Sequence, residues 1–136
     1  MNELKKDING KLLNGSDLAY VGDAYYELYI RLYLLKRGLT KPNNLHKEAI
    51  KYVQASSHNK IIKALYDNLT LDEQEIYKKG RNYNYHHKSK SSKLSEYLAS
   101  SGFEALVGYL YLTDNLDRLS WLMDESIKII ENEELK

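Results

Sequence analysis

The longest regular pattern of apolar residues lies between residues 16 and 35 and predicts a helix. Apolar side chains recur there at three- and four-residue steps along two adjacent stripes, which leaves a narrow polar strip. The first stripe comprises Leu18, Val21, Tyr25, Leu28, Leu32 and Leu35, and the second comprises Ala19, Tyr26, Ile30 and Tyr33. A helix that is apolar over most of its surface belongs in the interior of a domain. We therefore expect a central helix, with Ser16 or Asp17 as its N-cap and Arg37-Gly38 at its end.

The other apolar patterns also have helical spacing. We expect a short amphipathic helix through Leu4, Ile8 and Leu12, and a longer helical segment from Asn43 with a break at Ser56–Asn59. No strand-like alternation and no internal repeat is evident. The sequence therefore predicts an all-α fold of five to seven helices, with residues 1–136 forming a single domain.

The second half of the chain adds one capping signal and several breaks. Thr70 and Glu73 have the spacing of a capping box and predict a short helix over Leu71–Lys79. Loops or interruptions are expected at residues 80–92, 100–102 and 114–115. A last amphipathic helix follows, which completes the predicted helical domain.

Composition indicates where such a protein works. The chain has no cysteine, so it has no disulfide and no thiolate metal site, as is typical of a reducing compartment. No apolar run approaches the ~20 residues of a membrane span, and the first residues carry no secretion signal. We therefore expect a cytoplasmic protein that does not enter a membrane. Most of its 13 tyrosines are expected at helix-packing positions, with the hydroxyl on a polar partner.

Two acidic residues stand among apolar neighbours. Asp23 falls in the second stripe of the predicted central helix beside Tyr26, and Glu104 is the only acid between Tyr97 and Thr113. Burial of a lone carboxylate costs several kcal/mol, so each acid needs a partner. Separate ion pairs or hydrogen bonds would satisfy each of them. One divalent cation held between two helices would satisfy both.

Oxygen ligands in such a pattern suit Mg²⁺, with Mn²⁺ as a substitute. These ions keep several waters and accept one or two carboxylates together with substrate phosphate. They activate water and stabilise charge in phosphodiester cleavage. The pattern alone leaves both the ion pairs and the metal site open.

The segments around the two acids resemble the acidic motifs of the ribonuclease III catalytic domain. Residues 18–24, Leu-Ala-Tyr-Val-Gly-Asp-Ala, resemble its signature helix with a Leu-Gly-Asp-like step, and residues 103–108 resemble its Glu-Ala-x-x-Gly motif. The two acids are 81 positions apart, in the expected order. The short chain, Leu45-His46-Lys47 and Gly80-Arg81-Asn82 resemble the mini-ribonuclease III branch of the family.

This resemblance implies a fold and an activity. The family fold is a homodimeric helical bundle, the ribonuclease III endonuclease domain, with two sites along a cleft for double-stranded RNA. Metal-activated water cuts each strand and leaves 5′-phosphate and 3′-hydroxyl ends. The mini branch lacks the separate double-stranded-RNA-binding domain, for which we expect no room in this chain. It matures the ends of the 23S ribosomal RNA precursor, and a ribosomal protein that presents the RNA is a further candidate partner.

The resemblance also assigns roles to individual residues. Asp23 matches the central metal-binding aspartate and Glu104 the metal-bridging glutamate, so both are expected to be catalytic. Ala19 and Ser101 stand where other family members have two further carboxylates. The mini branch resembles this chain in lacking both of these carboxylates. We therefore expect one firmly held ion per site, with water and phosphate as additional ligands, and place Glu27 and Ser101 at the edge of the site.

A basic stretch from Lys78 to Lys93 contains no acid and is the candidate RNA contact. Its cationic and imidazole side chains could reach successive phosphates of a duplex, although a solvated loop is the more common meaning of such a run. The candidate RNA-binding residues are Lys78, Lys79, Arg81, His86, His87, Lys88, Lys90 and Lys93. Adjacent histidines in a loop are poor metal chelators, so His86 and His87 are not expected to bind a metal. For His46 we expect a capping or core-edge position, with surface contact to RNA as the alternative.

Two other classes of function compete with the nuclease. One is a ribonuclease III-like module that has lost its chemistry and binds RNA during ribosome assembly, as the missing carboxylates would allow. The other is a helical adaptor whose acids are ion-paired. The adaptor should be equally stable with and without Mg²⁺, whereas a metal that binds only the folded nuclease should stabilise it.

Overall fold

The structure, a computed structural model, describes residues 1–82 and 92–134. Within these ranges it contains seven α-helices, two short 3₁₀ turns and no strand, which confirms the expected all-α class. The α-helices are α1 (Asn2–Lys6), α2 (Gly15–Lys36), α3 (Pro42–Val53), α4 (Ala55–Leu65), α5 (Leu71–Asn82), α6 (Ser92–Leu112) and α7 (Leu116–Glu134). The 3₁₀ turns are η1 (Gly10–Leu12) and η2 (Tyr66–Asn68).

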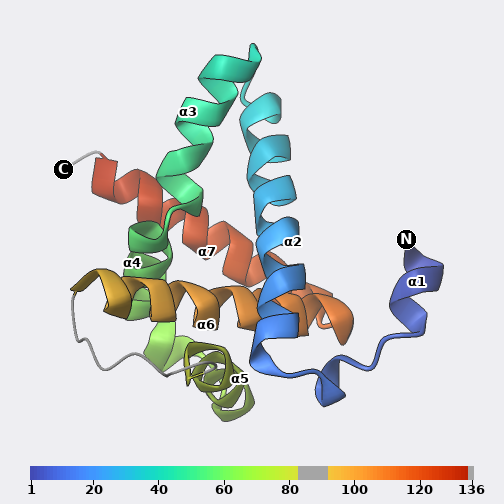
Figure 1. The fold of residues 1–136 in the computed structure, drawn as a ribbon. Helices are drawn as coiled ribbons and strands as arrows, with labels where there is room; N and C mark the ends of the chain where they lie inside the picture. The colour runs from blue at the N-terminus through green and yellow to red at the C-terminus, as the bar shows by residue number, and fades with distance from the viewer. Residues whose placement is uncertain (83–91, 135–136) are drawn as a thin grey trace.

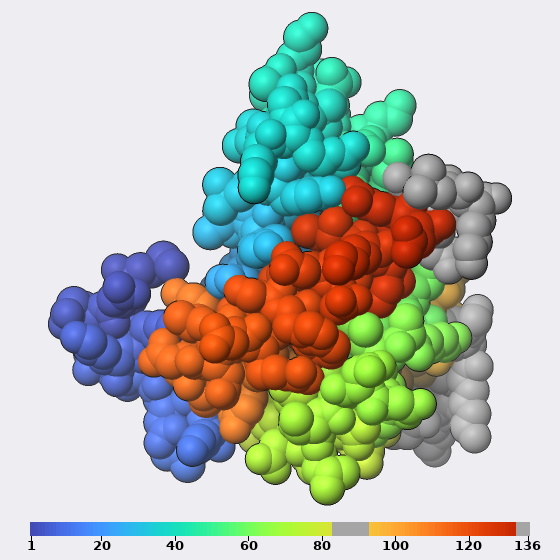
Figure 2. Space-filling model, turned by 180° about the vertical axis from the view of Figure 1, so that it is seen from behind, coloured from blue at the N-terminus to red at the C-terminus, as the bar shows by residue number. Residues whose placement is uncertain are grey.

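Helix α6 lies in the middle of the molecule. It packs against α2, α4, α5 and α7, and α2 crosses it steeply in Figure 1. Phe103, Leu106 and Val107 of α6 are completely buried and join the main core, to which α2, α3, α4, α5 and α7 also contribute. The far ends of α2 and α3 project from this body, and α1 stands apart at another edge (Figure 2). The most enclosed helix is therefore α6.

Helix α2 buries one face and leaves another in solvent. Its buried positions recur at four-residue steps and are Leu18, Gly22, Tyr26, Ile30 and Leu34. In contrast, Leu28, Leu32 and Leu35 are 50%, 57% and 49% exposed. The expectation of a helix enclosed around most of its circumference is therefore wrong. Neighbouring helices cover only part of α2, and an apolar stripe remains uncovered.

The start of the chain also differs from expectation. Helix α1 ends at Lys6 and buries no residue, and Leu12 lies in the separate turn η1 with 80% exposure. No single amphipathic helix runs through these positions. The N-cap of α2 is Asn14, whose side chain accepts a hydrogen bond from the backbone N–H of Asp17 at 2.8 Å. Asn14 thus fills the role predicted for Ser16 or Asp17.

Other element boundaries follow local signals more closely. Thr70 and Glu73 form the predicted capping box, with reciprocal side-chain-to-backbone hydrogen bonds of 2.9 and 3.1 Å. The break between α3 and α4 falls at Gln54, so the Ser56–Asn59 segment lies within α4. Residues 80–82 continue α5, and α6 runs without interruption through Ser100–Gly102. The rest of the predicted 80–92 loop, up to residue 91, lies outside the described residues.

Several tyrosines take the packing positions that composition suggested, whereas Tyr20 and Tyr97 are 82% and 63% exposed and do not. The hydroxyl of the buried Tyr26 donates to the backbone oxygen of Tyr52 at 3.0 Å, and Tyr29 donates to Asp124 at 3.2 Å.

Among the described helices, none is both long and apolar enough to cross a membrane.

Candidate active site

Asp23 and Glu104 meet where α2 crosses α6. Asp23 points to solvent from α2, whereas Glu104 is half-buried on α6. The expectation that Asp23 is buried in an apolar stripe is therefore wrong, and Glu104 bears the cost of burial. The two side chains are close enough to share a hydrogen bond.

Two glycines allow the helices to come this close. A β-carbon on Gly22 would lie 1.7 Å from the carbonyl oxygen of Glu104, and one on Gly108 would lie 2.0 Å from the carbonyl oxygen of Leu18. Neither distance is sterically possible, so only glycine permits this backbone contact. Gly22 directly precedes Asp23, and Gly108 lies one helical turn beyond Glu104. The same crossing therefore positions both acids.

The environment of Glu104 favours its neutral form. Burial, together with a hydrogen bond to Asp23 and the negative charges of Asp23 and Glu27, raises the pKa of Glu104 to about 9. At neutral pH, the Glu104 carboxyl therefore keeps its proton and donates it to the Asp23 carboxylate. Among the described residues, no cation takes part in this cluster near Glu104. The arrangement does not match the separate ion pairs that the sequence left open.

The donor set fits a hard divalent cation. Glu104 and Asp23 share a hydrogen bond. A cation bound between the two carboxyl groups would replace the proton of that hydrogen bond and favour the charged form of both. Within the described part of the chain, no three His, Asp or Glu side chains are grouped tightly enough to hold a metal by themselves. An ion at Asp23 and Glu104 would therefore need water or phosphate oxygens as well, as Mg²⁺ commonly does.

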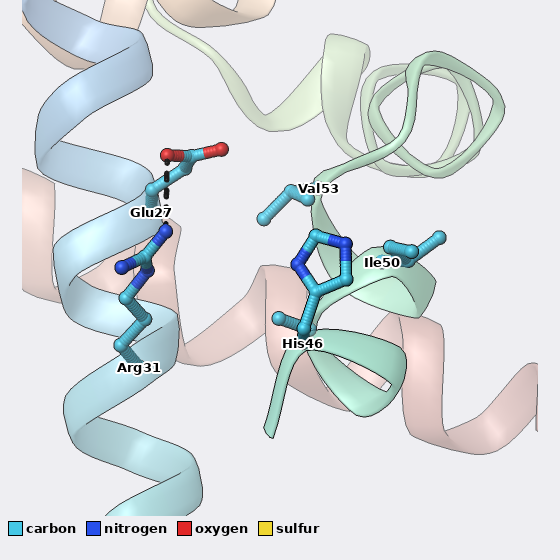
Figure 3. A pocket seen from close by; sticks show the side chains of 6 residues that line it. Glu27, Arg31, His46, Ile50 and Val53 are labelled. Atoms are coloured by element: carbon cyan, nitrogen blue, oxygen red, sulfur yellow. Dashed lines mark ion pairs between the residues drawn. The ribbon is translucent and has the colours of Figure 1, made fainter. Parts of the chain in front are cut away.

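Glu27 links this pair to a small pocket between α2 and α3 (Figure 3). Its carboxylate lies 3.9 Å from the guanidinium of Arg31, one turn further along α2. The imidazole of His46 stands opposite them on α3, near the side chains of Ile50 and Val53. The pocket has a volume of about 50 Å³. His46 is exposed and is not the cap of α3, so the capping or core-edge position expected for it is wrong.

An open apolar groove lies on the other side of Asp23. Its lining includes Leu4 and Ile8 near the start of the chain, Tyr20 and Leu28 of α2, and Tyr111 of α6. Both Asp23 and Glu27 also line it. Asp23 and Glu27 thus border an exposed apolar surface, a feature that commonly marks an interaction site.

The remaining predicted site residues are spread over α5 and α6. Lys78 pairs with Glu75 at 3.7 Å, and the ammonium of Lys79 donates to the carbonyl oxygen of Leu13 at 2.5 Å. The Arg81 guanidinium lies over the Tyr77 ring, 5.6 Å from its centre. Lys93 is exposed near the start of α6, and Ser101 is half-buried one turn before Glu104. His86, His87, Lys88 and Lys90 lie outside the described residues.

The family of the chain follows from comparison with known proteins. The profile of the Ribonuclease III domain matches residues 16–115, a span that contains Asp23, Glu104 and the crossing that joins them. The chain belongs to the ribonuclease III domain family. It is therefore an endoribonuclease of the kind that acts on double-stranded RNA, as the resemblance of its motifs implied.

Individual relatives cover nearly all of this ribonuclease III chain. The Mini-ribonuclease 3 of Streptococcus pneumoniae is 47% identical over 127 residues, which are 92% of this chain and 98% of the relative. That of Staphylococcus aureus is 38% identical over 128 residues, covering 93% and 96% of the two chains. A crystal structure of a Fusobacterium nucleatum protein superposes with a TM-score of 0.74 at 29% identity and covers 86% of this chain and 93% of that one.

Sequence reasoning missed two residues beside the acids. Arg31 lies on the polar strip of the predicted central helix, and the sequence predicts a cap or core-edge position for His46. The spacing of Asp23, Glu27 and Arg31, each four residues apart, already places them on one face of a helix. No such signal existed for His46, because only the packing of α3 against α2 brings it opposite that face.

Proposed function

We propose that this chain is a Mg²⁺-dependent endoribonuclease that cuts double-stranded RNA at a site formed by Asp23 and Glu104. The observation that carries the proposal is the pairing of these two acids without a cation at the α2–α6 crossing. Unpaired carboxyl groups destabilise a protein, so their concentration at one exposed point favours a function over a structural role. Mn²⁺ should replace Mg²⁺ because it accepts the same oxygen ligands.

In this proposal the acidic side chains at the α2–α6 crossing have distinct roles. Asp23 and Glu104 would hold the ion, and Glu104 would give up its proton to do so. Glu27 adds negative charge beside them, and Ser101 is a further candidate at the edge. A bound Mg²⁺ would supply an activated water and stabilise charge on the phosphate. Hydrolysis at this site would add a water oxygen to phosphorus and break the bond between phosphorus and the 3′ oxygen, which takes up a proton. The products would carry a 5′-phosphate and a 3′-hydroxyl.

Cutting both strands requires two such sites, so we propose a homodimer. The uncovered apolar stripe of α2 (Leu28, Leu32 and Leu35) is contiguous with the groove that Asp23 borders. Covering this stripe with the same stripe of a second copy would bring the acidic pairs of both chains to one interface. A two-fold contact of this kind is self-complementary, as is usual in homodimers.

The RNA itself would be bound mainly by charge. Lys78, Lys79, Arg81 and Lys93, together with His86, His87, Lys88 and Lys90, remain our candidates for contacts to phosphates along the duplex. The 23S ribosomal RNA precursor is the proposed substrate in the cytoplasm, with a ribosomal protein as a possible presenting partner. The whole chain, residues 1–136, would act as one catalytic domain.

Cleavage of a labelled RNA duplex tests the function. With Mg²⁺ the protein should cut both strands, and EDTA should stop cleavage. Asp23→Asn should abolish cleavage while the thermal unfolding midpoint stays within a few degrees of wild type, because Asp23 is exposed. Duplex binding without any cleavage would instead establish the RNA-binding module, and wild-type turnover by Asp23→Asn would refute the assigned site.

A further inference from the structure

A line of charged side chains runs along α2 away from the acidic pair. Asp23, Glu27 and Arg31 follow one another at four-residue intervals and share one face of the helix. Arg31 therefore lies about 12 Å along the helix axis from Asp23. The sign of the charge changes along this line, from two acids near the crossing to a cation beyond them.

The pairing of Arg31 within this line is weak. Its guanidinium is 3.9 Å from the Glu27 carboxylate, and the two side chains are 68% and 44% exposed. Exposed ion pairs at such a distance contribute little to stability. An arginine held so loosely can exchange its partner for a phosphate, which its planar guanidinium binds through two parallel hydrogen bonds.

His46 faces this pair from the neighbouring helix. Its imidazole projects from α3 into the space between the helices, where Glu27 and Arg31 form the opposite side (Figure 3). Ala49, Ile50 and Val53 also line the pocket, so a ligand atom there would meet polar groups of two helices beside apolar side chains of α3. With a volume of about 50 Å³, the pocket has room for an oxygen or two, not for a base.

We propose that Arg31 and His46 form a subsite for phosphodiester oxygens of the RNA strand that is cut at Asp23 and Glu104. They are positioning residues: they hold a neighbouring phosphate so that the scissile one lies at the acidic pair. The proposal rests on the proposed nuclease function. The subsite also gives a physical reason for the positive charge of Arg31 beside the acids. Without it, the negative charges of Asp23, Glu27 and Glu104 would repel the phosphates of an RNA strand on both sides of the metal site.

Single-turnover cleavage of a labelled duplex, measured against protein concentration at several salt concentrations, tests the subsite. Arg31→Gln should raise the half-saturating protein concentration roughly tenfold and lower the slope of log affinity against log salt by about one. His46→Gln should raise the half-saturating concentration by several-fold. Arg31→Lys should restore most of the salt slope, because it keeps the charge.

A matched control is available on α7. Lys128 is also 68% exposed and weakly paired, at 3.7 Å from Glu125, but it lies outside the pocket. Lys128→Gln removes one positive charge and should behave as wild type in both affinity and salt slope. Thermal unfolding of all variants should match wild type, which separates a loss of binding from a loss of fold.

The outcomes distinguish the subsite from the function on which it rests. If wild type cuts, but Arg31→Gln and His46→Gln match Lys128→Gln in affinity and salt slope, the subsite is refuted and the nuclease stands. If wild type binds the duplex without cutting it, the proposed function fails. The salt slopes of binding then still decide whether Arg31 contacts phosphate.

Discussion

Gly22 of α2 lies directly against the backbone of Glu104 of α6. The space between them is so small that a β-carbon on Gly22 would be 1.7 Å from the Glu104 carbonyl oxygen. A glycine next to one acid thus sets the position of the other acid. The close contact between α2 and α6 and the acidic pair lie at the same place. A substitution that moves the two helices apart should therefore also change cleavage.

Gly22→Ala should destabilise the protein by about 3 kcal/mol or more, because the methyl group can be accommodated only by moving α2 away from α6. Helix propensity alone predicts the opposite sign, since alanine stabilises a helix interior by about 1 kcal/mol relative to glycine. Urea unfolding measures the difference. Ser95→Ala, at an exposed position of α6, is the control and should change stability by less than about 0.5 kcal/mol. A Gly22→Ala protein as stable as wild type would mean that the helices do not cross this closely.

Glu104→Gln should stabilise the metal-free protein, and more so at high pH. The pKa of Glu104 is raised to about 9 in the folded state, so between pH 4.5 and 9 the folded protein binds a proton that the unfolded chain has released. The free energy of unfolding that the protonated Glu104 carboxyl contributes is therefore lost as pH rises through this window. The gain from Glu104→Gln should be larger at pH 8 than at pH 5 by about 4 kcal/mol.

Denaturant unfolding in EDTA at the two pH values measures this effect. Glu125 of α7 is 34% exposed and pairs with Lys128, so Glu125→Gln is a suitable control and should show no comparable gain. An equal response of Glu104→Gln at pH 5 and pH 8 would show that the carboxyl is ionised in the folded protein.

Acid should destabilise the protein through His58. This side chain is buried in α4, with its Nδ1 2.7 Å from the Ser100 hydroxyl, and within the described residues its Nε2 has no hydrogen-bond partner. Burial lowers the pKa of His58 to about 3, whereas an unfolded histidine has a pKa of about 6.5. Between these values the unfolded chain binds the extra proton, so stability falls as pH falls.

Comparison with His58→Gln isolates this contribution from that of the carboxylates. Between pH 7 and pH 4, wild type should lose about 3 kcal/mol more of its unfolding free energy than His58→Gln does. Unfolding in urea at a series of pH values gives both curves. Parallel curves would contradict a neutral, buried His58.

The apolar stripe of α2 should hold two copies together. Introducing charge with Leu28→Glu and Leu32→Glu should convert a dimer into a monomer in sedimentation experiments, because both side chains are about half exposed in the single chain. Leu116, which is 51% exposed at the start of α7, provides the control. Leu116→Glu should leave the dimer intact. Wild type that sediments as a monomer at micromolar concentration would rule out this interface.

The helical class and most helix positions were predictable because they depend on local signals. The Thr70–Glu73 capping box and the end of α2 at Arg37-Gly38 are read from a few neighbouring residues, and both are found in the structure. Burial was less predictable. The apolar stripe of α2 has the same spacing whether or not a neighbouring helix covers it, and in the described part of the chain Leu28 and Leu32 remain 50% and 57% exposed.

For the candidate site, too, the sequence predicted which residues matter but not how they are buried. The acidic motifs pointed to Asp23 and Glu104, but the sequence could not say which of them is buried, because this depends on how α2 meets α6. Periodicity placed Asp23 inside, whereas the structure places it in solvent and half-buries Glu104. The pairing of His46 with the Glu27–Arg31 face depends entirely on the contact between α2 and α3, for which the sequence contains no marker.

The central claim is that Asp23 and Glu104 together hold a divalent cation in place of the proton they share. Calorimetric titration of wild type with Mn²⁺ at pH 7, in buffers of different ionisation enthalpy, measures both binding and proton release. We predict about one proton released per ion, since Glu104 is neutral before binding, and a loss of affinity of at least roughly tenfold in Asp23→Asn and in Glu104→Gln. The double variant should lose little more than either single one. Binding without proton release, and unchanged in both single variants, would contradict the account.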